Sequence, residues 1–199
     1  MAAPNTVFAT PNQAQGILRG AMIACEDDDV PIENVRIGDI VNTLSDGPQV
    51  VRWVGNASNS AKVVEIKAGA LGRNTPIEAL IVAPAQRMVV SGWQAEVLFS
   101  ETRVMVSAEA LVNGESICYV EQTFDNDIYH ILFDKHEVIV ANGAASESFY
   151  PSKAAINGLS PEERDALVKH VPELNTMDPI HPFNLVHPVI SAAEAGLLR

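Results

Sequence analysis

Short apolar runs separated by turn residues dominate the chain as far as Pro151. Runs of this kind, bounded by Gly, Pro, Asn and Asp, are typical of β-strands. The pattern therefore predicts a mostly β domain, with strands expected at residues 22–25, 63–66, 80–82, 88–90, 103–106 and 117–120.

The stretch IYHILFDKHEVIVANGAASESFYP, residues 128–151, carries the most informative pattern. Apolar residues alternate from Tyr129 to Phe133, and a second apolar run covers residues 138–140. The polar pair Asp134-Lys135 between these runs predicts a hairpin. Asn142-Gly143 then favours a turn with positive φ at both central residues. We expect a hairpin followed by a loop in this stretch.

Turn residues predict two further hairpins. Asp46-Gly47-Pro48 lies between Leu44 and the apolar pair at positions 50 and 51. Asn113-Gly114 lies between the apolar residues 110–112 and the strand-like run 117–120. Both turns have the residue types that reverse the direction of a strand.

The region after Pro151 predicts a capped helix and an extended tail. Ser160 and Glu163 match a capping box, Pro161 suits the first helical position, and Pro172 ends the helix close to His170. Prolines at positions 179, 182 and 188 favour an extended segment, and residues 192–198 a short final helical turn. We therefore divide the chain into a flexible arm at 1–15, a β domain at 16–151, and a helix with a tail packed on the domain at 152–199.

Composition narrows the classes of partner and compartment. A chain of 199 residues that is 47% hydrophobic can build one substantial core. The net charge of −12 argues against binding to a phosphate backbone, so we expect no nucleic acid partner. We see no signal peptide and no apolar run long enough to span a membrane. Cys25 and Cys118 are too few for a disulfide framework.

Ordered motifs give a resemblance to a known family. His136-Glu137-Val138, Ala141-Asn142-Gly143 and the run SESF at 146–149 follow one another, and Gly38-Asp39 follows an apolar step near the start. In this order the motifs closely resemble Hint modules, the self-processing fold of hedgehog proteins and inteins, and in particular a bacterial Hint-like family. The resemblance implies a Hint fold of long bent strands and hairpins over nearly the whole chain after residue 15.

Residues that the resemblance would make catalytic are substituted in this chain. Hint self-processing begins with a Cys or Ser that attacks the preceding carbonyl, and the matching position is Gly16. The histidine that would protonate the leaving nitrogen is matched by Gln86, and the terminal His-Asn pair by Glu147-Ser148. Glycine cannot attack and glutamine transfers no proton near neutral pH. The sequence therefore argues against splicing or autoproteolysis, and we do not expect an enzyme of that mechanism.

Other candidate residues remain. His136 stands at the family's histidine position after the turn, and His130 stands where inteins often have an aspartate. They could form a relic acid–base pair, but we favour two hydrogen-bonded structural histidines. Cys25 could be a displaced nucleophile, although a buried structural cysteine is commoner. None of the five histidines has the close spacing of a zinc site, so we expect no metal and no cofactor.

Three functions are compatible with these residues. The one we favour is a catalytically degenerate Hint-like domain that acts as a structural or binding module, for example within a secreted or phage-like assembly. Such a module would associate with itself or with a protein partner. The first alternative is a self-cleaving Hint protein with a noncanonical nucleophile. The second is a domain that binds a small molecule or a metal in the former active-site cleft.

Overall fold

The computed structural model describes residues 15–59, 62–121, 126–176 and 183–198. The predicted flexible arm, residues 1–15, lies outside the described residues except for Gln15. Part of the predicted extended tail, residues 177–182, lies outside them as well.

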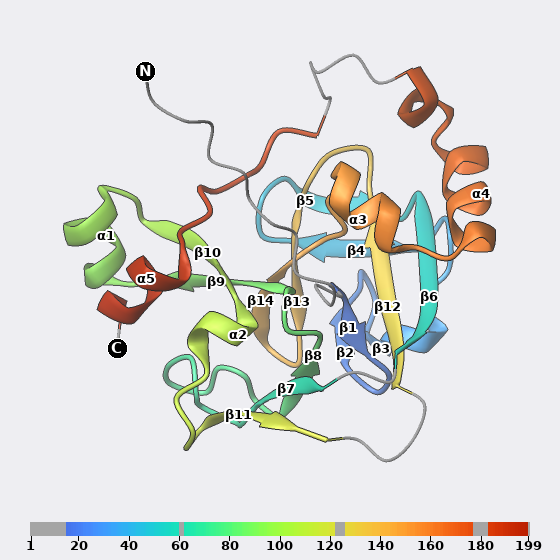
Figure 1. Cartoon of the computed structure of the whole chain (residues 1–199). Helices are drawn as coiled ribbons and strands as arrows, with labels where there is room; N and C mark the ends of the chain where they lie inside the picture. The colour runs from blue at the N-terminus through green and yellow to red at the C-terminus, as the bar shows by residue number, and fades with distance from the viewer. Residues whose placement is uncertain (1–14, 60–61, 122–125, 177–182, 199) are drawn as a thin grey trace, which may run out of the picture.

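Antiparallel strands make up the larger part of the regular secondary structure in the described residues, so the mostly β prediction is confirmed (Figure 1). One sheet brings together strands from the start, middle and end of the β domain, because β1 lies between β8 and β12. Its order is β11 (Ile117–Val120), β7 (Val63–Ile66), β8 (Leu80–Val82), β1 (Ile17–Leu18), β12 (Asn126–Leu132) and β6 (Trp53–Asn59).

The second sheet carries the motif-rich stretch 138–147. Its central strands pair with both the N-terminal hairpin and the middle of the chain. The order is β10 (Arg103–Ser107), β9 (Arg87–Ser91), β14 (Ala144–Glu147), β13 (Val138–Ala141), β2 (Met22–Ala24) and β3 (Asp29–Pro31), with β4 (Ile40–Thr43) pairing with both β13 and β5 (Gly47–Val50).

The prediction of a hairpin around Asp134-Lys135 is wrong. Strand β12 pairs with β1 and β6, whereas β13 pairs with β14, β2 and β4, so the two strands enter different sheets. The physical reason is burial on both faces, since residues 128–133 are all buried and alternation there does not separate a core face from a solvent face. The observed hairpin is β13–β14, and the predicted loop 144–147 is its second strand.

The turn of that hairpin is the one the sequence predicts. Asn142 and Gly143 have φ values of 46° and 78°, and Ala141 pairs with Ala144 across a two-residue loop. The predicted hairpin from Leu44 to Val50 is also confirmed, as β4–β5.

The predicted hairpin around Asn113-Gly114 is wrong. Residues 108–111 form a short helix, α2, and strand β11 pairs with β7 instead. The sequence Ala-Glu-Ala-Leu favours a helix over a strand. Asn113 ends this helix segment in a tight loop, because its Oδ1 accepts hydrogen bonds from the amides of Glu115, Ser116 and Ile117.

Helices occupy the periphery of the sheets (Figure 1). The helix predicted from Ser160 is confirmed, including its capping box and its end at His170. The predicted final helical turn is also present, whereas the helix that follows Gly92 has no counterpart in the sequence-based expectations. The helices are η1 (Ile32–Asn34), α1 (Trp93–Phe99), α2 (Ala108–Leu111), α3 (Lys153–Gly158), α4 (Pro161–His170), η2 (Pro172–Thr176), α5 (Ala192–Ala195) and η3 (Gly196–Leu198).

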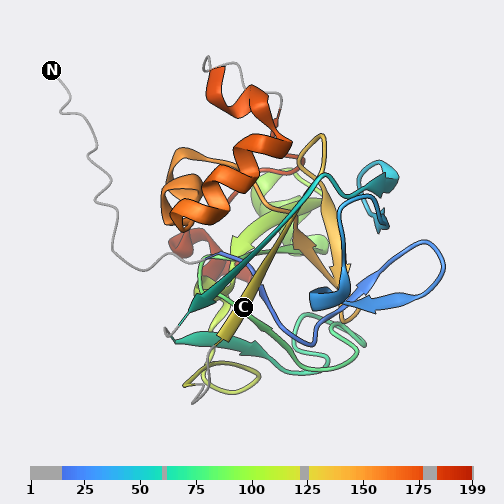
Figure 2. The same ribbon diagram turned by 90° about the vertical axis from the view of Figure 1, so that its right-hand side faces the viewer.

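A second core cluster joins the C-terminal helices to the strands. Trp53 on β6 and Leu132 on β12 meet Leu167 of α4, and all three are almost fully buried. Phe183, the first described residue of the last segment, belongs to the same cluster. Figure 2 shows the helices α3 and α4 gathered at one end of the strands. None of the helices in the described residues is long and apolar enough to cross a membrane.

Candidate functional site

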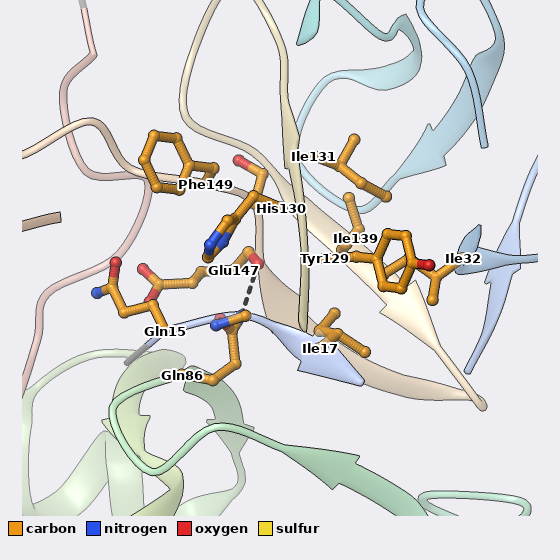
Figure 3. Close-up of a pocket in the computed structure, with 12 residues that line it drawn as sticks. Gln15, Ile17, Ile32, Gln86, Tyr129, His130, Ile131, Ile139, Glu147 and Phe149 are labelled. Carbon is orange, nitrogen blue, oxygen red and sulfur yellow. Dashed lines mark hydrogen bonds between the residues drawn. The ribbon is translucent and has the colours of Figure 1, made fainter. Parts of the chain in front are cut away.

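A small cavity lies where Gly16, Gln86, His130 and Glu147 come together (Figure 3). The four residues come from different elements: the residue before β1, the loop before β9, strand β12, and the end of β14. The free volume is about 10 Å³, which is room for about one water molecule. The fold therefore brings together three positions that the sequence comparison with Hint modules singled out: 16, 86 and 147.

Gly16 is enclosed by neighbours that leave no room for a side chain. A Cβ placed on this residue would overlap Cγ2 of Ile128 and lie 2.9 Å from Cε1 of His130. Its φ of 121° is also one that only glycine adopts readily. Both sterics and backbone conformation therefore require glycine at this position.

The side chain of Gln86 holds the backbone of Gly16 by a hydrogen bond. Its Oε1 accepts a hydrogen bond of 2.8 Å from the Gly16 amide, and its Nε2 donates to Ser146 Oγ at 2.8 Å and to the Glu147 carbonyl at 2.9 Å. The side chain is only 4% exposed. The reversed amide would place Nε2 against another N–H donor, so the network determines its orientation. Gln86 thus acts as a hydrogen-bonded bridge with no proton to transfer.

Glu147 is a buried carboxylate held by a neighbouring arginine. Its Oε1 accepts from the Arg87 amide at 3.1 Å, and its Oε2 forms an ion pair with Arg87 Nη1 at 3.0 Å. A buried charge needs such a partner. The arginine that follows Gln86 in sequence therefore compensates the charge of the acid that the sequence resemblance matches to an intein histidine.

His136 lies beside the same oxygen of Glu147, Oε2, that pairs with Arg87. Its Nδ1 accepts a hydrogen bond of 3.3 Å from the amide of Val186, which leaves the proton of the neutral ring on Nε2. Nε2 is 3.4 Å from Glu147 Oε2 but outside hydrogen-bond geometry. Tyr150 packs edge-on against the ring at 5.4 Å. His136 therefore connects the site to the C-terminal segment.

His130 lies against the cavity within an aromatic cluster. Its ring centroid is 4.9 Å from that of Phe149 and 6.4 Å from that of Trp53, to which it is stacked. Burial lowers the pKa of His130 to about 4. The imidazole is therefore neutral near pH 7 and cannot supply a proton as a general acid there.

Cys25 is not brought to the cavity. It forms an isolated bridge with Val41, away from the lining residues, and it is partly buried. Burial raises the pKa of its thiol, with smaller contributions from the carboxylates of Asp39 and Asp29. A raised pKa lowers the fraction of reactive thiolate at neutral pH.

A second buried acid, Glu137, lies next to the site and was not predicted from the sequence. Glu137 is 1% exposed; its Oε2 accepts a 2.9 Å hydrogen bond from Thr43 Oγ1, and its amide donates to Ser148 Oγ at 2.9 Å. The hydrophobic pattern of the sequence does not indicate that Glu137 and Glu147 are buried. The pairing of β13 with β4 places Thr43 beside Glu137, and the pairing of β14 with β9 places Arg87 beside Glu147.

A metal site is not supported by these residues. Within the described ranges, no three His, Cys, Asp or Glu side chains lie close enough together to hold a metal ion. The acids near the cavity are instead engaged by Arg87 and Thr43.

Comparison with known proteins identifies the family. A family model described as the Hint domain matches residues 16–153. The chain belongs to the Hint domain family. The match begins at Gly16, the residue enclosed at the cavity, and ends just after the SESF run. No curated protein matches the chain.

Solved structures with the same fold are inteins and intein-like domains. A bacterial intein-like domain from Clostridium thermocellum is similar with a TM-score of 0.52 and 13% identity, over 68% of this chain and 99% of that chain. A splice-inactive variant of the AceL NrdHF class 3 split intein gives a TM-score of 0.50 and 13% identity, over 70% of this chain and 100% of that chain. Similarity at this identity shows the Hint fold and nothing about activity.

Proposed function

We propose that this Hint domain no longer processes itself and acts as a structural or binding module. The observation that carries the proposal is the enclosure of Gly16. Self-processing requires a side-chain nucleophile at this position, and here Ile128 and His130 occupy the space that a side chain would need.

The hydrogen-bond network at Gln86 supports the same function. An acid that protonates the leaving nitrogen must hold a proton and point it at the Gly16 nitrogen. Gln86 instead presents Oε1, an acceptor, to the Gly16 N–H. The contact therefore stabilises the intact peptide and does not supply the proton that the nitrogen would need as a leaving group.

The first test is the intact mass of the full chain carrying an N-terminal extension, followed over days with and without thiol or hydroxylamine. We expect one unchanged mass under all conditions. Thiol and hydroxylamine cleave any thioester or ester formed at the site, so a truncated chain that ends near residue 15 would refute the proposal. A cut near Cys25 would instead favour the displaced-nucleophile alternative.

Neither alternative has an observation that favours it over the proposal. The raised pKa of Cys25 and its absence from the residues that line the cavity argue against a displaced nucleophile. The free volume of about 10 Å³ at the former active site is far below the roughly 300 Å³ typical of small-molecule pockets.

Exposed apolar side chains on α1 and η3 support a role in binding protein. Trp93 is 69% exposed, Val97 is 71% exposed, and Leu197, on the neighbouring η3, is 58% exposed. Exposed groups of this kind are common at protein interfaces. We expect association with a protein partner or with a second copy, within an assembly such as a secreted or phage-like particle. Sedimentation velocity of the unchanged chain and of a Trp93→Ser, Val97→Ser variant tests self-association.

A further inference from the structure

A second, larger cleft lies beside the Gly16 cavity and separate from it. Its volume is about 520 Å³, within the range of small-molecule sites. Three segments form its walls: the β4–β5 turn, the turn after β12, and residues 184–187 of the C-terminal segment, with Arg103 at the start of β10 completing it. His136 lies between the cavity and the cleft, since it lines the cleft and faces Glu147.

The C-terminal segment is held firmly enough to form a wall. Met105 of β10 donates its amide to the Pro188 carbonyl at 2.8 Å and accepts from the Ile190 amide at 3.0 Å, as a parallel bridge. Val186 donates to His136 Nδ1 on the other side of the wall. The segment is therefore fixed on both sides of His187.

Positive groups outnumber negative ones in this cleft, although the chain has a net charge of −12. Arg103 and Lys135 line it, with Asp46 as the acidic lining residue. Lys135 Nζ pairs with Asp46 at 3.0 Å, while Arg103 forms no hydrogen bond or ion pair of its side chain in the described part of the chain. Arg103 is thus a guanidinium available to an anion.

His187 adds a buried polar atom with no partner. Its Nε2 is inaccessible to solvent and forms no hydrogen bond to any described residue. Burial, and next the positive charge of Arg103, lower the pKa of His187, whereas Glu101 acts in the opposite direction. The imidazole therefore lies near Arg103 and can donate or accept a hydrogen bond in its neutral form.

Two leucines give the cleft an apolar part. Leu44 from the β4–β5 turn is 45% exposed and Leu185 from the C-terminal segment is 39% exposed. Apolar surface combined with a few convergent polar groups is typical of sites for small organic ligands.

We propose that this cleft binds a small organic anion, whose carboxylate or phosphate group pairs with Arg103 and Lys135 and whose apolar part lies on Leu44 and Leu185. The site is separate from the Gly16 cavity, and its test does not depend on whether the domain processes itself.

The test is a two-dimensional amide NMR titration of the full ¹⁵N-labelled chain with hexanoate, hexyl phosphate and hexanol. We expect at least one of the two anions to shift the amide signals of residues 44–46 and 184–187, and hexanol to leave them in place because it lacks the charge. A response to only one anion identifies the head group. The absence of any shift with both anions overturns the proposal.

Charge substitutions complete the test. Arg103→Gln should weaken anion binding about tenfold or more, the loss expected for one charge-assisted hydrogen bond. Arg73→Ala is the matched control, because it removes one positive charge from an exposed loop residue outside the cleft. Lys135→Gln provides a second variant if Arg103→Gln does not fold. Equal affinity in the Arg103 or Lys135 variant and the control would overturn the proposal.

Discussion

At the scale of single residues, Gly16 combines two constraints that are usually separate. Its φ of 121° excludes most side chains on backbone grounds, and the contacts with Ile128 and His130 exclude them on packing grounds. The position that the sequence resemblance matches to the nucleophile of self-processing Hint modules thus requires the residue without a side chain. We therefore expect that restoring self-processing at this position would require more than one substitution.

We predict that Gly16→Cys neither restores cleavage nor folds as stably as the unchanged chain. Backbone strain and overpacking each cost about 1–3 kcal/mol, so the free energy of unfolding should fall by about 2–6 kcal/mol. Urea denaturation measures the loss, and intact mass with added thiol measures cleavage. Gly196→Ala is the control, because its φ of −59° and open surroundings accept a side chain. Thiol-dependent cleavage in Gly16→Cys would show that the cavity accommodates the nucleophile.

Burial of His130 should make the free energy of unfolding depend on pH. Its pKa is about 4 in the folded chain and near 6.5 when unfolded, so between these values the unfolded chain binds more protons. Stability from the neutral ring is therefore complete above pH 6.5 and is lost as the pH falls toward 4, by up to about 3 kcal/mol.

The measurement is the free energy of unfolding against pH for the unchanged chain and for His130→Phe, which keeps an aromatic ring beside Phe149. The difference between the two curves should appear between pH 6.5 and about 4. The contributions of the carboxylates and of His187 to the free energy of unfolding are present in both proteins and cancel when the two curves are subtracted. Parallel curves across this window would mean that His130 protonates without cost.

At the scale of secondary structure, the turn at Asn142 connects elements that are distant in sequence. Its Oδ1 accepts from the Met22 amide at 2.7 Å, and its Nδ2 donates to the Ala79 carbonyl at 2.9 Å. The backbone carbonyl accepts from Ile77 at 2.8 Å. One residue therefore provides the turn conformation and also joins the β13–β14 hairpin to β2 and to the loop before β8.

We predict that Asn142→Gly lowers the free energy of unfolding by about 1–3 kcal/mol, because it keeps the positive φ but removes two hydrogen bonds, one to the partly buried Met22 amide and one to the exposed Ala79 carbonyl. Asn142→Ala should lose about 1–2 kcal/mol more, since alanine must also adopt the left-handed backbone. Urea denaturation of the pair separates the two contributions. Equal stability of the glycine variant and the unchanged chain would show that the side-chain bonds contribute little.

The elements also show where sequence reasoning stops. The Asn-Gly turn and the capping box of α4 follow from local chemistry, and both are found as expected. The pairing of β12 does not follow from local chemistry, because its neighbours β1 and β6 are far from it in sequence. The next strand along the chain, β13, enters the other sheet.

At the scale of the whole molecule, the second core cluster determines whether the C-terminal region folds with the β domain. Leu167 on α4 is fully buried against a cluster that includes Trp53 of β6 and Phe183. Arg52, next to Trp53, also pairs with Glu173 at 2.7 Å and with Asp134 at 2.7 Å. These contacts favour one cooperative unit.

We predict that Leu167→Ala lowers the melting temperature of a single transition, at a cost of about 2–5 kcal/mol for the cavity that it creates. Differential scanning calorimetry tests this, with Lys169→Ala as an exposed control on the same helix that should change stability by about 0.5 kcal/mol or less. A separate low-temperature transition in the leucine variant would mean that the C-terminal region unfolds independently.

The sequence by itself determined the family and the mostly β class, and it predicts that Gly16, Gln86 and Ser148 replace the nucleophile, the proton donor and the terminal asparagine. Motif order and residue identity carry this information, because a missing functional group is missing in any fold. Only the tertiary structure decided that Gly16 is enclosed, that Gln86 holds its amide, and that Arg87 and Thr43 compensate the acids at 147 and 137. Those contacts join residues far apart in the chain, and their energies depend on burial, which exists only after the sheets have assembled.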